Sequence, residues 1–180
     1  QRQMCIRDRV LGRVALARGD LATAERHLLQ VTGDSVAETN AFLLRAEIDI
    51  RRERPALALE KLAAAERLIA ERGMSRPRDL SFLQGDALAR LGRHAEAEKA
   101  FEREIADHPR NRQAYARLAI VYGLLHRTYG DVDRLLARMF EVDRSAASAE
   151  IAAQTMENLG DKATARRWRE RARKLARTAG

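Results

Sequence analysis

The chain has 180 residues, of which 46% are hydrophobic, only 4% are aromatic and 33% are charged. Three prolines and ten glycines are too few for an all-β protein rich in tight turns, and the single cysteine excludes an intramolecular disulfide and a zinc site built from cysteines alone. A core of Leu, Ala, Ile and Val beneath a highly charged surface predicts an all-α protein. No apolar run approaches the roughly 18 residues of a membrane span.

The formal net charge is +8, and almost all basic residues are arginine. Together with abundant alanine, this bias is typical of a GC-rich bacterial genome, so the charge excess is partly an effect of codon usage. It does not by itself require a nucleic-acid partner.

The first nine residues, Gln1–Arg9, differ in character from the rest of the chain. Met4–Arg9 reads MCIRDR, and its codons can spell a string that resembles the transposon-end sequence of common sequencing-library adapters. We interpret residues 1–9 as translated adapter fused to a truncated reading frame and expect no structured domain there; a native N-terminal tail is the alternative. On this interpretation the true N-terminus is missing, and Cys5 has no functional weight.

From Val10 onward, apolar residues recur with helical spacing. Pro55 stands where one helix is expected to begin, and Gly73 where that helix is expected to end. The predicted apolar faces comprise Leu21, Ala24, Leu28 and Val31; Ala58, Leu62, Ala65 and Ile69; Leu80, Leu83, Ala87, Leu88 and Leu91; and Tyr115, Leu118, Ala119, Tyr122 and Leu125.

The same pattern of small residues returns along the chain. Val10–Val31 and Leu83–Ile105 share an apolar helix, a Gly, a polar pair and then Ala followed by a bulky residue. An alanine follows Gly19, Gly92 and Gly160 after five residues each time, and the distances from Gly12 to Ala46, Gly85 to Ala119 and Ala119 to Ala153 are all 34 residues. Small residues at fixed spacing permit two helices to cross closely, with a bulky side chain beside them.

These residues resemble the tetratricopeptide repeat (TPR), a helix–turn–helix unit of about 34 residues. The copy from Arg78 to Asn111 fits best, with Gly85, Leu88, Gly92, Ala97, Phe101 and Pro109 on family positions. The resemblance implies an all-α, right-handed superhelical solenoid of about five antiparallel helix–turn–helix repeats. We expect one solenoid domain over residues 10–177, with repeats at about 10–38, 39–77, 78–111, 112–145 and 146–177.

Two departures from the repeat carry predictions. The distance from Ala46 to Gly85 is 39 residues, which places five extra residues in Arg67–Asp79 and predicts a longer helix or exit loop there. The fourth repeat has His126 where a turn glycine is expected, so Gly130 and Asp131 predict a turn four residues late. Turns are thus expected near Gly19, Arg54, Gly92, Gly130 and Gly160.

No catalytic pattern is present in the sequence. The four histidines, His27, His94, His108 and His126, include no pair at i, i+4, and no Walker loop, dinucleotide fingerprint or Gly-x-Ser-x-Gly elbow occurs. We predict that the protein is not an enzyme and has no catalytic residue, metal or cofactor.

TPR domains bind partners on a concave surface lined by first helices, and the resemblance implies a protein–protein interaction scaffold with a protein or peptide partner. By position, the partner-binding groove comprises Arg13, Asn40, Glu47, Arg51, Asp86, Arg90, Gln113, Arg117, Glu150, Gln154 and Glu157. Leu43, Phe82 and Ala116 occupy positions where the family's clamp for chaperone C-terminal carboxylates has Lys, which argues against that partner class.

The last expected helix carries a second charge feature. Its basic patch comprises Arg166, Arg167, Arg169, Arg171, Arg173, Lys174 and Arg177, with Trp168 on the apolar side as a core residue. The patch is either the solubilising face of a terminal repeat or a contact for an acidic partner, a membrane surface or RNA. Because so few aromatic residues are available for base stacking, a nucleic-acid partner is not expected.

An alternative to an independent scaffold is that the chain is the C-terminal TPR segment of a larger bacterial protein. The tail Leu159–Leu175 resembles repeats at the end of some large multidomain proteins, including sulfatase-like hydrolases. The compartment expected for either protein is the bacterial cytoplasm or periplasm.

Overall fold

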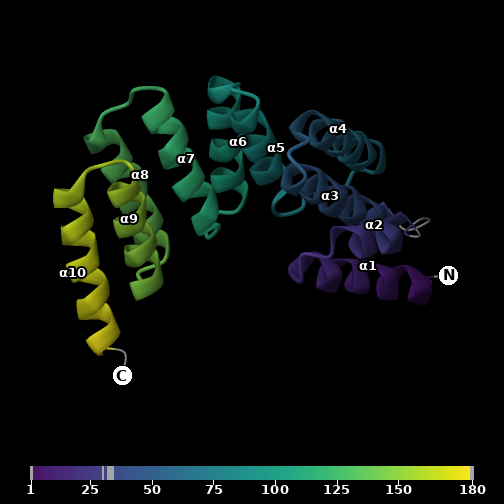
Figure 1. Cartoon of the computed structure of the whole chain (residues 1–180), viewed down its shortest axis with the longest axis horizontal. Coiled ribbons are helices and arrows are strands. Elements are labelled where there is room, and N and C mark those ends of the chain that lie inside the picture. Colours follow the sequence, from purple (N-terminus) through teal and green to yellow (C-terminus); the bar gives the residue numbers. More distant parts are fainter. Residues whose placement is uncertain (1, 30, 32–34, 179–180) are drawn as a thin grey trace. The chain divides into compact units, whose positions relative to one another are not determined.

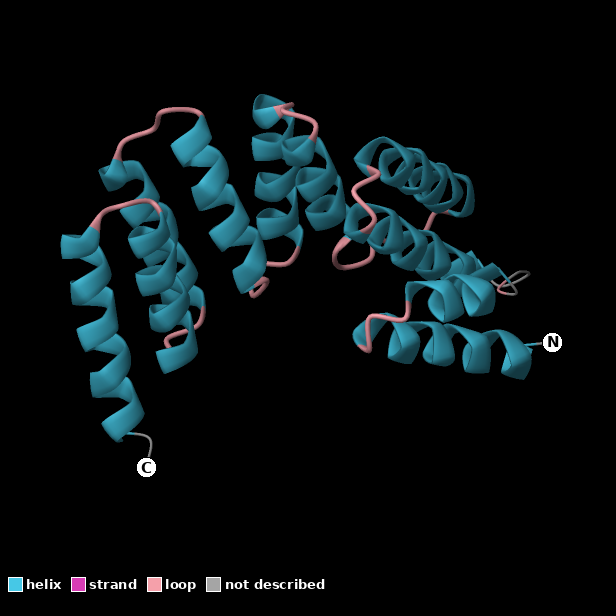
Figure 2. Cartoon of the chain, in the orientation of Figure 1, coloured by secondary structure: helices cyan, strands magenta, loops and turns pink. Residues whose placement is uncertain are grey.

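The computed structural model describes residues 2–29, 31 and 35–178, and the elements in these residues are all helices (Figures 1 and 2). No helix among them is long and apolar enough to cross a membrane. They are α1 (Arg2–Ala17), α2 (Leu21–Leu29), α3 (Ser35–Arg51), α4 (Pro55–Arg72), α5 (Leu80–Arg90), α6 (His94–Asp107), α7 (Arg112–Leu124), α8 (Tyr129–Val142), α9 (Ala146–Asn158) and α10 (Lys162–Thr178). The predicted all-α class is confirmed.

The chain divides into two compact units, Gln1–Gly92 and Arg93–Gly180. The division falls in the turn between α5 and α6, inside the expected third repeat. A single solenoid domain over 10–177, and a right-handed superhelix, stay predictions.

In the first unit, α1 with α2 and α3 with α4 form antiparallel hairpins, and α3 contacts both α1 and α5 (Figure 2). Gly12 shows why a small residue recurs at helix crossings: a Cβ built on it would lie 2.9 Å from Leu28 Cγ. Ala24 and Leu28 of α2 are fully buried in the same cluster. A second cluster includes Ala58 and Leu62 of α4, which hold the corresponding places in the next hairpin.

In the second unit, α7 with α8 and α9 with α10 form hairpins, and α9 packs against α7, α8 and α10. The alanines Ala149, Ala152 and Ala153 of α9 are fully buried, which allows this close packing. Trp168 is 5% exposed, so the prediction that it is a core residue is confirmed.

Four of the five expected turns are confirmed. Gly19, Gly92 and Gly160 have φ of 78°, 74° and 96°, the left-handed conformation that glycine adopts without a steric penalty. Near Arg54 the positive φ belongs to Glu53, and Pro55 begins α4. Gly73 ends α4 in the left-handed conformation, also as expected.

The predicted fourth turn at Gly130 is wrong. His126 itself takes the left-handed conformation, with φ of 56°, and the turn lies between Leu124 and Tyr129. The side chain of Thr128 then forms a capping box with Asp131, which starts α8 and places Gly130 inside its first turn. As a result α7 has 13 residues, like α9, and is not lengthened.

The extra residues of the second repeat lie where the spacing placed them. Helix α4 has 18 residues, against 14 in α6 and in α8. The exit loop from Gly73 to Asp79 follows it, and Asp79 has a φ of 72°.

At the N-terminus, residues 2–9 belong to helix α1, and the expectation that residues 1–9 form no structured domain stays a prediction. Helix α1 begins at Arg2, because no Gly or Pro in its first nine residues interrupts it. Asp8 is 8% exposed, and its carboxylate lies 3.3 Å from Nδ1 of His27 on α2. An adapter origin of these residues stays a prediction. The first repeat differs from its predicted range at its end, because α3 begins at Ser35, inside the range 10–38.

Candidate partner-binding surfaces

The first unit contains a hollow of about 370 Å³, which we call the α1–α3 hollow. It brings together four residues predicted for the groove: Arg13, Asn40, Glu47 and Arg51. The full lining is Arg13, Leu16 and Ala17 of α1; Asn40, Leu43, Leu44, Glu47 and Arg51 of α3; Arg78 and Asp79 of the exit loop; and Leu83 of α5. The first helices of this unit therefore form a concave site with leucines among its polar groups.

Arg51 holds the α1–α3 hollow in shape. Its Nη1 donates a hydrogen bond to the carbonyl oxygen of Leu16 at 2.9 Å, and its Nη2 lies 2.7 Å from Oε1 of Glu47. The guanidinium thereby adds a second hydrogen bond to a carbonyl near the end of α1, which also accepts one from the backbone N–H of Gly19 at 3.1 Å. Arg51 is thus a structural residue of the site, where the sequence indicated a free contact residue.

Arg90 repeats this arrangement one hairpin later. Its Nε lies 3.1 Å from Oδ2 of Asp86 one helical turn earlier, as Arg51 lies beside Glu47. Both pairs are i, i+4 ion pairs, so two of the predicted groove cations are already neutralised by their own helices.

Arg13 and Asn40 are the groups of the hollow that are available to a partner. Arg13 is exposed and makes no ion pair within the described chain. The amide of Asn40 donates to the carbonyl oxygen of Val36 at 2.9 Å, which leaves its Oδ1 to accept a further hydrogen bond. A partner can therefore present a carboxylate to Arg13 and a backbone N–H to Asn40.

The exit loop adds residues that sequence reasoning missed. Arg78 and Asp79 line the hollow, with Nε of Arg78 3.6 Å from Oδ1 of Asp79. Both side chains are more than half exposed. The five-residue insertion, which predicted a longer helix or exit loop, was the signal available in the sequence for this loop. Leu83 was predicted only for a helix packing face, although it also lines the site, as do Leu16 and Leu44.

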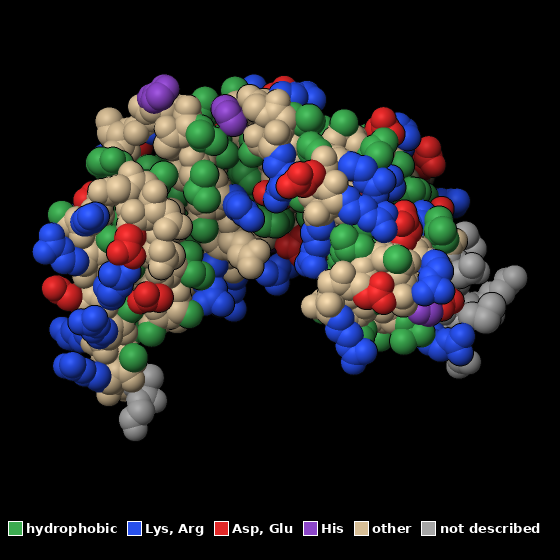
Figure 3. Space-filling model, viewed as in Figure 1, with side chains coloured by type: hydrophobic (Ala, Val, Ile, Leu, Met, Phe, Trp, Pro, Cys, Tyr) green, Lys and Arg blue, Asp and Glu red, His purple; other side chains and the backbone are tan. Residues whose placement is uncertain are grey.

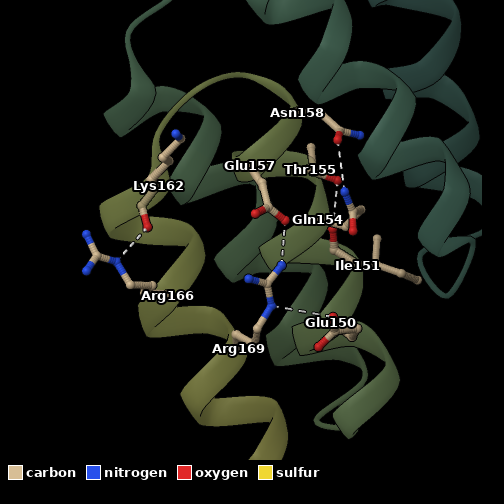
Figure 4. Close-up of polar contacts among 9 residues, drawn as sticks. All are labelled: Glu150, Ile151, Gln154, Thr155, Glu157, Asn158, Lys162, Arg166 and Arg169. Atoms are coloured by element: carbon tan, nitrogen blue, oxygen red, sulfur yellow. Dashed lines mark hydrogen bonds and ion pairs between the residues drawn. The ribbon is translucent and has the colours of Figure 1, made fainter.

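In the second unit, Glu150 and Glu157 do not stand free in a groove. Figure 4 shows Arg169 reaching from α10 toward both of them on α9. Its Nη2 lies 2.5 Å from Glu157 Oε2, and its Nε lies 3.8 Å from Glu150 Oε1. The hydrogen bond to Glu157 raises the pKa of the Arg169 guanidinium above its ordinary value. Residues expected in two separate sites thus form one ion cluster.

The other groove residues predicted for this unit lie on α7 and α9. Gln154 donates to Oδ1 of Asn158 at 2.9 Å along the surface of α9 (Figure 4). Gln113 and Arg117 are exposed on α7. A continuous groove over all eleven predicted residues stays a prediction.

The predicted basic patch separates into two groups. Arg167 lies 3.5 Å from Asp133 Oδ2, and Arg171 lies 4.1 Å above the ring of Phe140, so both contact α8. With Arg169 they contribute to packing within the unit. The remaining members, Arg166, Arg173, Lys174 and Arg177, face solvent without an ion pair in the described chain.

Known structures share the fold. No protein-family model matches the sequence, and no curated protein matches it either. A thermophilic TPR protein from Thermus thermophilus superposes with a TM-score of 0.72 at 16% identity, covering 96% of this chain and 91% of that one. MamA 41-end from Desulfovibrio magneticus RS-1 superposes with a TM-score of 0.61 at 16% identity, covering 97% of this chain and 96% of that one. A further crystal structure of MamA superposes with a TM-score of 0.60 at 17% identity, covering 94% of this chain and 96% of that one. The fold is therefore TPR-like, as the repeat pattern indicated.

Proposed function

We propose that this protein is an interaction scaffold that binds a segment of a partner protein in the α1–α3 hollow. The observation that carries the proposal is the combination of leucines with two available polar groups, Arg13 and Asn40, in one concave site. Binding sites in proteins have this composition, because apolar walls supply affinity and a few polar groups fix orientation.

The preferred ligand follows from these groups. Leu44 is partly exposed in the hollow, whereas Leu16 and Leu43 beside it are buried, so the hollow offers a small apolar contact to one apolar side chain of a peptide. Arg13 favours an Asp or Glu beside that anchor, since an Arg–carboxylate pair is a strong, charge-assisted hydrogen bond. Because Arg51 already fixes α1 to α3, the site needs little rearrangement on binding.

We also propose that the protein acts without catalysis. Among the residues that the structure describes, no three His, Cys, Asp or Glu side chains gather in a way that could hold a metal ion. The carboxylates that line the hollow, Glu47 and Asp79, each lie beside an arginine: Glu47 pairs with Arg51 one turn later, and Asp79 lies beside Arg78.

A peptide selection tests the proposal. A phage library of random 12-residue peptides is selected on the full chain, and the enriched peptides are measured by fluorescence anisotropy against Arg13→Glu and Arg67→Glu variants. Arg67 is an exposed residue of α4 outside the hollow, so its variant is a matched control for charge reversal.

We expect enriched peptides to combine an apolar residue with Asp or Glu. The Arg13→Glu change should lower their affinity at least about tenfold, because one charged hydrogen bond is lost. The control should change affinity less than about twofold, because an isolated surface charge contributes little. Peptides that bind both variants as tightly as the wild type would place the binding site elsewhere and contradict the proposal.

A further inference from the structure

The positive charge of this chain is concentrated in one helix. Eight residues of α10 are basic and one is acidic, so α10 carries seven of the eight net positive charges, while the rest of the chain has 26 basic and 25 acidic residues. Codon bias raises arginine content everywhere and does not produce this distribution. Figure 3 shows Lys and Arg side chains gathered along this part of the molecule.

The structure separates the basic residues of α10 into those that support packing and those that are free. Arg167, Arg169 and Arg171 contact Asp133, Glu157 and Phe140. The others make no ion pair in the part of the chain that is described, and we call them the free cationic face: Lys162, Arg166, Arg173, Lys174 and Arg177. At 3.6 residues per turn they fall within a sector of about 120° and extend over roughly 22 Å of helix.

The opposite side of α10 is occupied by the protein itself. Ala165, Trp168 and Ala172 are 2%, 5% and 6% exposed, so they are not available to enter a bilayer. A helix that binds a membrane surface inserts its apolar face, and α10 has none to offer. A membrane would be held by charge alone.

The free cationic face also lacks what a protein interface needs. Among the residues that the structure describes, α10 exposes no large hydrophobic side chain. Protein interfaces derive most of their affinity from buried apolar or aromatic anchors, and Lys is depleted in them. A polyanion is different, because release of its counterions supplies the affinity when cations neutralise its phosphates.

We propose that the free cationic face of α10 binds the phosphate backbone of duplex DNA without sequence preference. A helix with its side chains is about 10–12 Å wide, which suits the major groove of about 12 Å. The face presents cations on both sides of its outer ridge, Arg166 and Arg173 on one side and Lys174 on the other, toward phosphates on both walls. The scarcity of aromatic residues, which argued against nucleic acid, bears only on single strands, whose bases stack on aromatic rings.

The test is the salt dependence of binding by the full chain to a fluorescein-labelled 20-base-pair duplex, followed by fluorescence anisotropy. Five phosphate contacts predict a slope of about −4.5 for log K against log of the salt concentration, a loss of roughly 500-fold between 50 and 200 mM. Removing three charges in Arg166→Gln/Arg173→Gln/Arg177→Gln should reduce the slope to about −1.8. Glu170→Gln, which removes the one acidic residue of α10, should strengthen binding.

A matched control removes three exposed arginines of the same unit outside α10, in Arg103→Gln/Arg110→Gln/Arg144→Gln. The control should leave the slope near −4.5, and circular dichroism should show that each variant keeps its helices. An equal reduction of the slope in both triple variants would mean that net charge alone binds the duplex, and it would overturn the proposal. Absence of duplex binding at 50 mM salt would overturn it too, as would tighter binding to vesicles of 30% phosphatidylserine in phosphatidylcholine.

Discussion

Replacing Gly12 by alanine tests the helix crossing that defines the first hairpin. The added Cβ would lie 2.9 Å from Cγ and 3.0 Å from Cδ2 of Leu28, and 3.4 Å from the carbonyl oxygen of Ala24. Leu28 is fully buried, and protein cores pack closely enough that a side chain has little room to move aside. The two helices must therefore separate slightly or Leu28 must leave its rotamer.

The expected magnitude follows from two opposing effects. Alanine in the middle of a helix is favoured over glycine by roughly 0.5–1 kcal/mol. Overpacking a tight core costs about 1–3 kcal/mol. We therefore expect Gly12→Ala to lower the free energy of unfolding by about 0.5–2 kcal/mol, against the direction of helix propensity.

Gly130 is the matched control, because it also lies in a helix but has space around it. The nearest atom to its added Cβ is Thr128 Oγ1 at 3.6 Å, an ordinary contact. Gly130→Ala should raise the free energy of unfolding by up to about 0.5 kcal/mol, less than in a helix centre because it lies in the first turn.

Urea unfolding at pH 7, followed by far-UV circular dichroism, measures both variants. A Leu28→Ala change alone should cost about 2–5 kcal/mol, and combined with Gly12→Ala it should cost less than the sum, because the new methyl fills part of the cavity. Equal stabilisation of the chain by both glycine substitutions would refute the crossing, and so would strict additivity of Gly12→Ala with Leu28→Ala.

Three further predictions concern the second unit. Ala97→Leu should destabilise the chain by about 1–3 kcal/mol in urea titrations, because Ala97 is fully buried. Ala95→Leu should change stability by less than about 0.5 kcal/mol, because Ala95 is exposed, and the reverse order would show a wrong repeat register. His126→Gly should raise the melting temperature, since glycine adopts a φ of 56° without strain, and a lower melting temperature would argue against that turn. Hydrogen bonds from Thr128 lower the pKa of Asp131 below the ordinary value of an aspartate. The stability that this carboxylate contributes is therefore present above that ordinary value and is lost as the pH falls through the lowered pKa. The loss of stability on Asp131→Asn should therefore shrink in melts at strongly acidic pH, and a loss independent of pH would contradict this role.

The sequence predicted the hairpins well because their determinants are local. The 34-residue spacing from Gly12 to Ala46 and the five-residue spacing from Gly92 to Ala97 fix where helices cross, and no long-range information is needed. The turn at His126 was missed because residues other than glycine are uncommon in the left-handed conformation, while Gly130 nearby offered a stronger turn signal. The capping box of Thr128 with Asp131 was visible in the sequence and would have placed the start of α8 correctly.

The candidate sites were harder to predict, because helical position shows which face a side chain occupies and not what it contacts. Arg51 binds the carbonyl oxygen of a residue 35 positions earlier, which turns an apparent ligand contact into a structural one. Glu157 is paired with Arg169 on the following helix, 12 positions later. Pairings of this kind depend on tertiary packing, so the sequence placed the first helices correctly and left open which of their charges are free.

The measurement that tests the central claim most directly is an NMR titration of the ¹⁵N-labelled chain with a peptide from the selection. The α1–α3 hollow predicts chemical-shift changes in the backbone amides around Arg13, Asn40 and Leu44, together with the exit loop at Arg78, and their loss in the Arg13→Glu variant. Shift changes confined to α4 or α10, with the amides around Arg13 and Asn40 unaffected at saturation, would contradict it.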